Sequence, residues 1–217
     1  MRYGRGRRLV HRAVLAVVAL AGLAGASAAA HSRQPLIWVF GDSLAAGYGL
    51  PPAQGFTAQL QAALRRSGIA ASVRNGGVAG DTAAQGRARL KWGLRGLGAA
   101  PDLVIVELGA NDMLRGLPVD QARDNLDVIL TELDRRHLPV LIAGMRAAPN
   151  LGPDYGRAFD AIYPSLSKKH GAPLYPFFLD GVAGRPALIQ ADGLHPNAKG
   201  VAVIVRRILP RIRSALR

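Results

Sequence analysis

Residues 36–44 read Leu-Ile-Trp-Val-Phe-Gly-Asp-Ser-Leu, an apolar run that ends in a polar turn. The uninterrupted apolar part, 36–40, predicts a strand that is buried on both faces. Ser43 stands where this strand gives way to a turn, a position that can expose a nucleophile. A serine at such a turn also commonly caps the next helix. Because serine needs an adjacent base to react, Ser43 is a candidate nucleophile only if the fold brings a base to it.

The rest of the chain alternates between strand-like and helix-like segments. Further strands are predicted at 71–74, 103–108, 140–143 and 173–178, and Glu107 is the one charged residue in the most apolar of them. Helices are predicted at 56–66, 82–97, 119–136, 155–170 and 197–216, the last bent or interrupted at Pro210. Apolar strands separated by helices predict one α/β domain with a five-stranded parallel sheet covered on both faces.

The first 30 residues have the pattern of a secretory signal peptide. Five arginines precede an apolar stretch at 13–26, and small residues at 27–30 favour cleavage after Ala30. The apolar stretch is shorter than the roughly 20 residues that span a bilayer. We therefore expect a signal peptide at 1–30, one folded domain at 31–217, export to the periplasm, and no membrane span after cleavage.

Composition narrows the possible partners and chemistry. The chain of 217 residues has a formal charge of +14, and removing the five arginines of the first segment leaves +9. It lacks a compact basic run with interleaved aromatic residues, so nucleic-acid binding is not expected. It has no cysteine, which excludes disulfides and a lipid anchor on cysteine. Nothing in the sequence indicates the oligomeric state.

Four polar blocks follow predicted strands, at 41–44, 80–82, 109–112 and 192–195. In doubly wound sheets the carboxyl ends of the parallel strands meet at one edge, and ligands bind beyond that edge. The four blocks are therefore predicted to converge there, although they are far apart in the sequence. This convergence supports a shared site more strongly than any single block does.

His195 is the best candidate for the base that Ser43 needs. Asp192 precedes it by three residues and could accept from its Nδ1–H while Nε2 faces Ser43. The alternative is an ordinary polar loop before the last helix. Of the other four histidines, two lie near the N-terminus and two end predicted helices, where an imidazole can meet the last carbonyls: His11, His31, His137 and His170.

Gly80 and Asn111 are candidate oxyanion donors together with the backbone N–H of Ser43. Acyl transfer places negative charge on the former carbonyl oxygen, so donors aimed at that oxygen lower the barrier. A glycine lets its backbone N–H approach closely, and an asparagine side chain supplies an amide N–H. The alternatives are a plain turn for Gly80 and a cap for Asn111.

The sequence disfavours a metal-dependent phosphoesterase and the usual α/β-hydrolase fold. Asp42, Asp81 and Asp112 near His195 suggest a metal phosphoesterase, but the sequence has no Asp-x-His or paired-His spacing, and capping accounts for these residues. No metal or other cofactor is expected. A Gly-x-Ser-x-Gly elbow is absent around Ser43, which disfavours the usual α/β-hydrolase fold.

The four blocks together resemble those of the GDSL, or SGNH, hydrolases. They are Gly-Asp-Ser-Leu at 41–44, Gly80, Gly-x-Asn-Asp at 109–112 and Asp-x-x-His at 192–195. Other stretches, including 106–112 and 161–164, are similar to the bacterial periplasmic thioesterase, lysophospholipase and arylesterase subgroup. The resemblance implies a flavodoxin-like three-layer α/β/α sandwich and hydrolysis of acyl esters and thioesters without a metal. It also implies a Ser43–His195–Asp192 triad with an oxyanion hole of Ser43 N–H, Gly80 N–H and Asn111.

Alternatives for the substrate and role stay open at this point. A carbohydrate O-acetylesterase of the same family would need a sugar-binding rim, for which Trp92 and a few tyrosines are candidates. A non-catalytic binding module is disfavoured because every catalytic position is filled. The segments 92–100 and 114–118 are candidates for the wall of an acyl groove.

Overall fold

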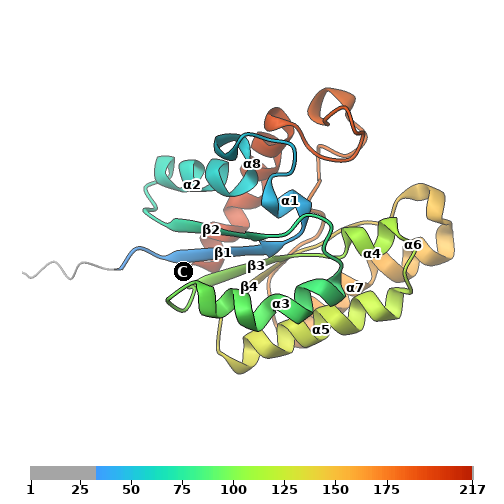
Figure 1. Cartoon of the computed structure of the whole chain (residues 1–217), viewed down its shortest axis with the longest axis horizontal. Coiled ribbons are helices and arrows are strands. Elements are labelled where there is room, and N and C mark those ends of the chain that lie inside the picture. The colour runs from blue at the N-terminus through green and yellow to red at the C-terminus, as the bar shows by residue number, and fades with distance from the viewer. Residues whose placement is uncertain (1–32, 217) are drawn as a thin grey trace, which may run out of the picture. The chain divides into compact units, whose positions relative to one another are not determined.

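The computed structural model describes residues 33–216, so the predicted signal peptide lies outside the described residues. Five parallel strands form a single sheet in the order β2-β1-β3-β4-β5 (Figure 1). Their bounds are β1 Leu36–Gly41, β2 Ser72–Gly77, β3 Leu103–Glu107, β4 Val140–Ala143 and β5 Leu174–Tyr175. This strand order is that of flavodoxin-like doubly wound sheets.

Helices cover both faces of the sheet, as the sequence predicts. One layer holds α2 Phe56–Arg66 and α8 Ala198–Ala215, and the other holds α3 Ala83–Gly96, α5 Val119–Arg135 and α7 Ile162–His170 (Figure 1). Shorter helices lie in the connections: α1 Ser43–Ala46, α4 Ala110–Leu114 and α6 Pro153–Asp160. The predicted three-layer α/β/α sandwich is confirmed. None of the helices within residues 33–216 is both long enough and apolar enough to span a membrane.

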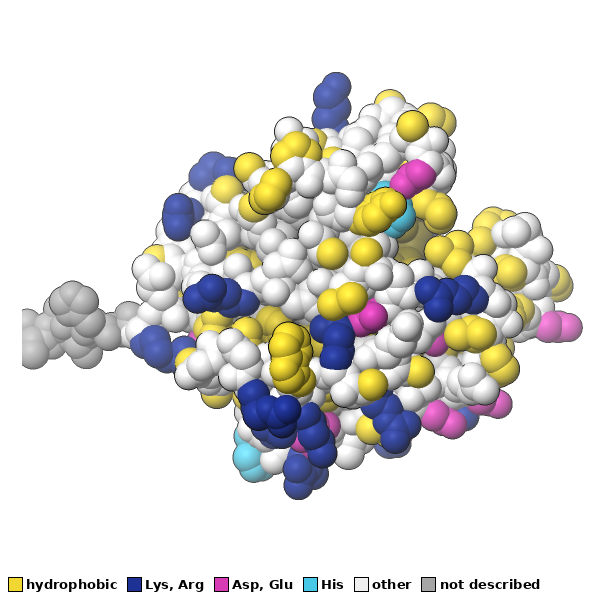
Figure 2. All heavy atoms as spheres, in the orientation of Figure 1, with side chains coloured by type: hydrophobic (Ala, Val, Ile, Leu, Met, Phe, Trp, Pro, Cys, Tyr) yellow, Lys and Arg dark blue, Asp and Glu magenta, His cyan; other side chains and the backbone are white. Residues whose placement is uncertain are grey.

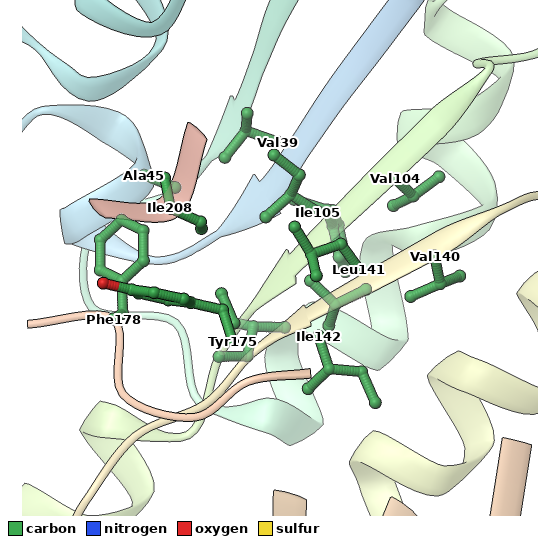
Figure 3. Close-up of a cluster of buried hydrophobic side chains, with 14 of the residues drawn as sticks. Val39, Ala45, Val104, Ile105, Val140, Leu141, Ile142, Tyr175, Phe178 and Ile208 are labelled. Atoms are coloured by element: carbon green, nitrogen blue, oxygen red, sulfur yellow. The ribbon is translucent and has the colours of Figure 1, made fainter. Parts of the chain in front are cut away.

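The hydrophobic core lies between the sheet and the two helical layers. All six residues of β1 and all five of β3 are buried. Figure 3 shows side chains from neighbouring strands packed together with a residue of α8, among them Val39, Ile105, Leu141, Tyr175 and Ile208. Burial on both faces explains why these strands are apolar throughout rather than alternating.

Prolines account for two differences from the predicted elements. The single helix expected at 155–170 is two helices that meet at Ala161, because Pro164 cannot donate to the carbonyl of Asp160 and its ring clashes there. The strand expected at 173–178 contains only Leu174 and Tyr175, because prolines on both sides cannot donate to the sheet.

Pro210 does not interrupt α8, so one of the two effects expected of it, an interruption, does not occur. The helix continues through it to Ala215. Pro210 and Arg206, whose carbonyl loses its helical donor, are both exposed. Solvent can therefore hydrate that carbonyl, and the buried face of the helix keeps its packing.

Candidate active site

Ser43 begins α1 directly after β1, at the carboxyl edge of the sheet. It is not the helix cap, because Asp42 holds that position and accepts from the N–H of Leu44 at 3.0 Å. The Ser43 hydroxyl is therefore not needed for capping. It lies instead 2.8 Å from Nε2 of His195.

His195 is held from its other side by Asp192 in the same loop. Its Nδ1 lies 2.6 Å from Asp192 Oδ2, while Asp192 Oδ1 accepts the backbone N–H groups of Leu194 and His195 at 2.9 and 3.0 Å. These backbone bonds, and then the imidazole, lower the pKa of Asp192 to about 2. The carboxylate is thus ionised near neutral pH and can orient an imidazole that accepts a proton at Nε2.

Tyr48 packs against the imidazole, which sequence reasoning did not anticipate. The two ring centroids are 4.6 Å apart with the planes tilted by 40°. Gln190 Nε2 donates to the Tyr48 carbonyl at 2.8 Å and so ties this turn to the chain just before the histidine loop. The contact limits the positions open to the ring of His195.

Gly80 and Asn111, predicted as oxyanion donors together with the N–H of Ser43, line the same cavity as Ser43 and His195. Gly80 has φ +85°, a left-handed conformation that favours glycine, and its carbonyl accepts from Arg115 at 2.7 Å. The Asn111 amide donates to Asp42 Oδ2 at 3.1 Å and to the carbonyl of Asp81 at 3.0 Å. Both amide hydrogens thus already have protein acceptors, so stabilising an oxyanion requires Asn111 to share or exchange one of them.

The aspartates beside these donors have structural partners. Asp112 accepts the N–H of Ala83 at the start of α3 at 2.8 Å, and Asp81 forms a short ion pair with Arg89. Asp42 caps α1. Within residues 33–216, no group of three or more histidine, aspartate or glutamate side chains is arranged to hold a metal ion.

Arg89 reaches from α3 under the loops that carry the site. It donates to the carbonyls of Gly41 at 2.8 Å and Gly76 at 2.9 Å, pairs with Asp81, and lies 4.3 Å from the centre of the Phe40 ring. One side chain therefore connects the ends of β1 and β2 to the loop after β2. The sequence offered no signal for this role, because Arg89 looks like any charged residue of an amphipathic helix.

Glu107 is the third residue of the site, after Tyr48 and Arg89, that the sequence did not predict. It ends β3 and is fully buried, and it pairs in register with Gly41 of β1. A Cβ on Gly41 would lie 2.6 Å from Glu107 Oε2, so only a glycine at position 41 leaves room for the Glu107 side chain. Burial, and then the nearby Asp42 charge, raise the pKa of Glu107 well above its usual value. The sequence could have singled out Glu107, because it is the one acid in an otherwise apolar strand.

A cavity of about 930 Å³ opens beside Ser43 and His195. Figure 2 shows a hollow bordered by hydrophobic side chains, with a histidine at its edge. Its wall comes mainly from segments that the sequence did not identify, including Met145, Phe177, Leu179 and Ile189.

Of the two segments predicted to form this wall, only 114–118 contributes, through Leu114. Segment 92–100 does not line the cavity. Trp92 lies on α3 with 72% of its surface exposed and is not a sugar platform at this site. Trp92 is therefore displaced from Ser43 and His195, whereas Tyr48, one of the tyrosines that could serve as a sugar platform, lines the cavity.

The two histidines predicted to end helices, His137 and His170, lie in different surroundings. His170 ends α7, but its ring nitrogens contact Asp134 at 2.5 Å and Asp127 at 2.8 Å on α5 rather than helix carbonyls. His137 follows α5 with φ 55°. Neither lines the cavity beside Ser43.

Ser43, His195 and Asp192 form a chain of hydrogen bonds at the carboxyl edge of a doubly wound sheet. Hydrolases that transfer acyl groups use this arrangement. Comparison with known proteins agrees with this class. The model of the GDSL-like lipase/acylhydrolase family matches residues 39–203. The chain belongs to this family of carboxylic ester hydrolases.

Curated relatives and a solved structure support the same assignment. Esterase TesA of Pseudomonas aeruginosa is 37% identical over 82% of this chain and 88% of its own length. An arylesterase of Vibrio mimicus is 39% identical over 79% and 84%, and thioesterase 1/protease 1/lysophospholipase L1 of Escherichia coli (strain K12) is 39% identical over 73% and 74%. The crystal structure of AlinE4, an SGNH-hydrolase family esterase, is 51% identical, covers 85% of this chain and 97% of its own, and has a TM-score of 0.72.

Proposed function

We propose that this chain is a serine hydrolase that cleaves acyl esters and thioesters through Ser43, His195 and Asp192. The observation that carries this proposal is the continuous hydrogen-bond series from Asp192 Oδ2 through the imidazole to Ser43 Oγ. Such a series lets the imidazole accept the serine proton as the oxygen attacks, while the carboxylate stabilises the resulting imidazolium.

The reaction proceeds in two acyl-transfer steps. Ser43 Oγ attacks the acyl carbon, and its proton moves to His195 Nε2. The oxyanion is held by the N–H groups of Ser43 and Gly80 and by the Asn111 amide, each typically worth about 3–4 kcal/mol. The tetrahedral species then expels the alcohol or thiol, which takes the proton from His195. Water, activated by His195, releases the acyl group and restores Ser43.

The cavity supports an apolar acyl group as the part of the substrate that is recognised. Its wall is largely aliphatic and aromatic, and its volume of about 930 Å³ exceeds what an acetyl group needs. The names of the relatives, esterase, arylesterase and thioesterase/lysophospholipase, agree with an ester or thioester substrate. The sequence of residues 1–30 supports export, with the periplasm as the proposed location.

The test compares the wild type with Ser43→Ala on short-chain and long-chain p-nitrophenyl esters and on acyl-CoA. We expect kcat to fall by about 10³-fold or more in the variant, because only the oxyanion hole and substrate binding remain. Treatment with a chelator is expected to leave wild-type activity unchanged. Activity in Ser43→Ala equal to that of the wild type would exclude the serine mechanism, and loss of activity with the chelator would point to a metal.

A further inference from the structure

Two carboxyl groups are buried together directly beneath the candidate nucleophile. Asp42 follows β1 and Glu107 ends the neighbouring strand β3, and both side chains are fully buried. The N–H of Asp42 donates to Glu107 Oε2 at 3.3 Å. Glu107 Oε1 is also buried, and no hydrogen-bond partner for it is found among residues 33–216. The mechanism above does not use Glu107.

The hydrogen bonds of this pair indicate where a proton would reside. Asp42 Oδ1 accepts from Leu44 N–H and Oδ2 from Asn111, while Glu107 Oε2 accepts from Asp42 N–H. A proton on any of these three oxygens would weaken an existing bond. Glu107 Oε1 is the remaining oxygen, and protonating it disrupts nothing.

Electrostatics favours the same site for the proton. Two adjacent buried carboxylates cannot both be ionised without a large desolvation cost. Burial raises the pKa of Asp42 to about 6, and it raises the pKa of Glu107 well above its usual value. After burial, the nearby charge of Asp42 adds to the rise in the pKa of Glu107.

The charged groups around the pair are engaged elsewhere, so they do not neutralise a second carboxylate in place of this proton. Asp81 is paired with Arg89, whose other hydrogen bonds go to backbone carbonyls, and His195 is engaged by Ser43 and Asp192. On the side of α7, the Tyr163 hydroxyl donates to the carbonyl of Leu108 at 3.1 Å. No cation among residues 33–216 forms a salt bridge with Glu107.

We propose that Glu107 is a positioning residue for the oxyanion hole, and that it acts as a neutral acid whose O–H donates to Asp42. This bond holds Asp42 where it orients the Asn111 amide. It also leaves one negative charge instead of two beneath the oxygen that becomes an oxyanion. With less charge on Asp42, the Asn111 amide can give up a hydrogen to that oxygen. The inference rests on the proposed acyl-transfer function.

The first test compares Glu107→Gln with Glu107→Leu, two side chains of similar size. Gln keeps an N–H donor toward Asp42, so kcat is expected to stay within about 3-fold of the wild type. Leu removes the donor, and we expect kcat to fall about 10- to 100-fold with KM within about 2-fold, the cost of one hydrogen bond to a charged group. Equal kcat values for the two variants would overturn the proposal, provided both show cooperative thermal unfolding.

The pH profile separates this role from a purely structural one. In the wild type, kcat should fall at alkaline pH when the shared proton is lost and a second negative charge appears beneath the oxyanion. Gln has no such proton to lose, so this alkaline decrease should be absent in Glu107→Gln. An identical alkaline decrease in both proteins would contradict the proposal.

Infrared spectroscopy tests the proton without relying on activity. The difference spectrum between Ser43→Ala and Ser43→Ala/Glu107→Gln at neutral pH should contain the C=O stretch of a protonated carboxyl, with a shift in D₂O. Absence of this band would overturn the proposal even if the wild type hydrolyses esters and Glu107→Leu fails to fold. If the band is present but the wild-type protein does not hydrolyse esters, the shared proton stands and only the proposed function is removed.

Discussion

Ser43 Oγ lies 2.8 Å from His195 Nε2, although 152 positions separate the two residues in the chain. The serine follows β1, the second strand of the sheet, and the histidine lies in the loop just before α8. Both elements direct these residues to the carboxyl edge of the parallel sheet. The contact therefore depends on the whole domain being folded, and any change that loosens α8 is expected to affect activity as well as stability.

Replacing Asp192 with Asn should separate its charge from its role in the turn. The Asn Oδ1 can still accept the backbone N–H groups of Leu194 and His195, but the charge is lost and an NH₂ group faces the imidazole. We expect kcat to fall by about 10²–10⁴-fold because the imidazole is held in the wrong tautomer. Since the pKa of Asp192 is about 2, loss of activity in weakly acid solution should not come from this carboxylate.

Asp134→Asn is the matched control, because Asp134 contacts the ring of another histidine, His170, at 2.5 Å and lies away from the cavity. Its activity should equal that of the wild type. If kcat of Asp192→Asn also stayed within about 5-fold of the wild type, the orienting role of Asp192 would be wrong.

Arg89→Met should lower stability by removing the connection between the ends of β1 and β2. Asp81, whose side chain is only 9% exposed, would keep its charge without a partner. We expect the free energy of unfolding to fall by about 3 kcal/mol, measured by urea denaturation. Arg89→Lys should recover part of this loss because it keeps the charge but not the fork of donors.

The control for this change is Arg95→Met, an exposed arginine on the same helix. It should alter the free energy of unfolding by no more than about 0.5 kcal/mol. A similar loss in both variants would show that the carbonyl contacts of Arg89 are not the cause.

Ala148→Leu should shorten the acyl group that the enzyme prefers. Ala148 lines the cavity beside Ser43, and a larger side chain displaces about two methylenes of a bound chain, each worth about 0.8 kcal/mol. We expect the ratio of kcat/KM for long-chain over short-chain p-nitrophenyl esters to fall about 10-fold.

Ala62→Leu makes the same chemical change in a separate cavity of about 420 Å³ between α2 and α8. The chain-length ratio of this variant should match the wild type. A fall of the same size in both variants, or in neither, would mean that the cavity beside Ser43 does not bind the acyl chain.

The buried acids should also make stability depend on pH in a defined direction. The pKa of Asp42 is raised from 3.8 to about 6, so the folded protein holds this proton more tightly than the unfolded chain. The resulting stabilisation is fully present below about pH 3.8 and is lost as the pH rises through about 6. Burial also raises the pKa of Glu107 well above its usual value, so this group contributes to the pH dependence in the same direction.

Glu107→Gln should reduce this dependence, since it removes one titrating group. Urea denaturation at pH 4.5 and pH 8 should give a difference in unfolding free energy that is smaller than in the wild type. Parallel pH dependence in the two proteins would show that the pair does not share a proton in the folded state.

Much of the site followed from local sequence. Ser43, Gly80, Asn111 and His195 each stand in a short polar block after a strand, and the parallel sheet brings such blocks to one edge. Asp192 was predictable because a turn places it against a histidine three residues later. Glycine positions and polar breaks in apolar runs reflect local backbone requirements, which sequence patterns record well.

Other parts of the site depended on contacts between distant segments. Much of the cavity wall comes from the loops after β4 and β5, whose residues have no distinctive pattern in the sequence. Tyr48 and Arg89 likewise look ordinary along the chain, and Glu107 stands out only as a lone acid in an apolar strand. Their roles appear only through contact with His195, Gly41 and Asp42.

The sequence by itself determined the layered α/β architecture, the carboxyl edge as the location of the site, and the five residues proposed for its chemistry. Hydrophobic periodicity and turn preferences are local, and they suffice for those conclusions. Only the tertiary structure decided which side chains surround the cavity beside Ser43 and which buried acid lies next to Asp42. Burial, desolvation and side-chain contact depend on how distant segments pack, and no local pattern specifies them.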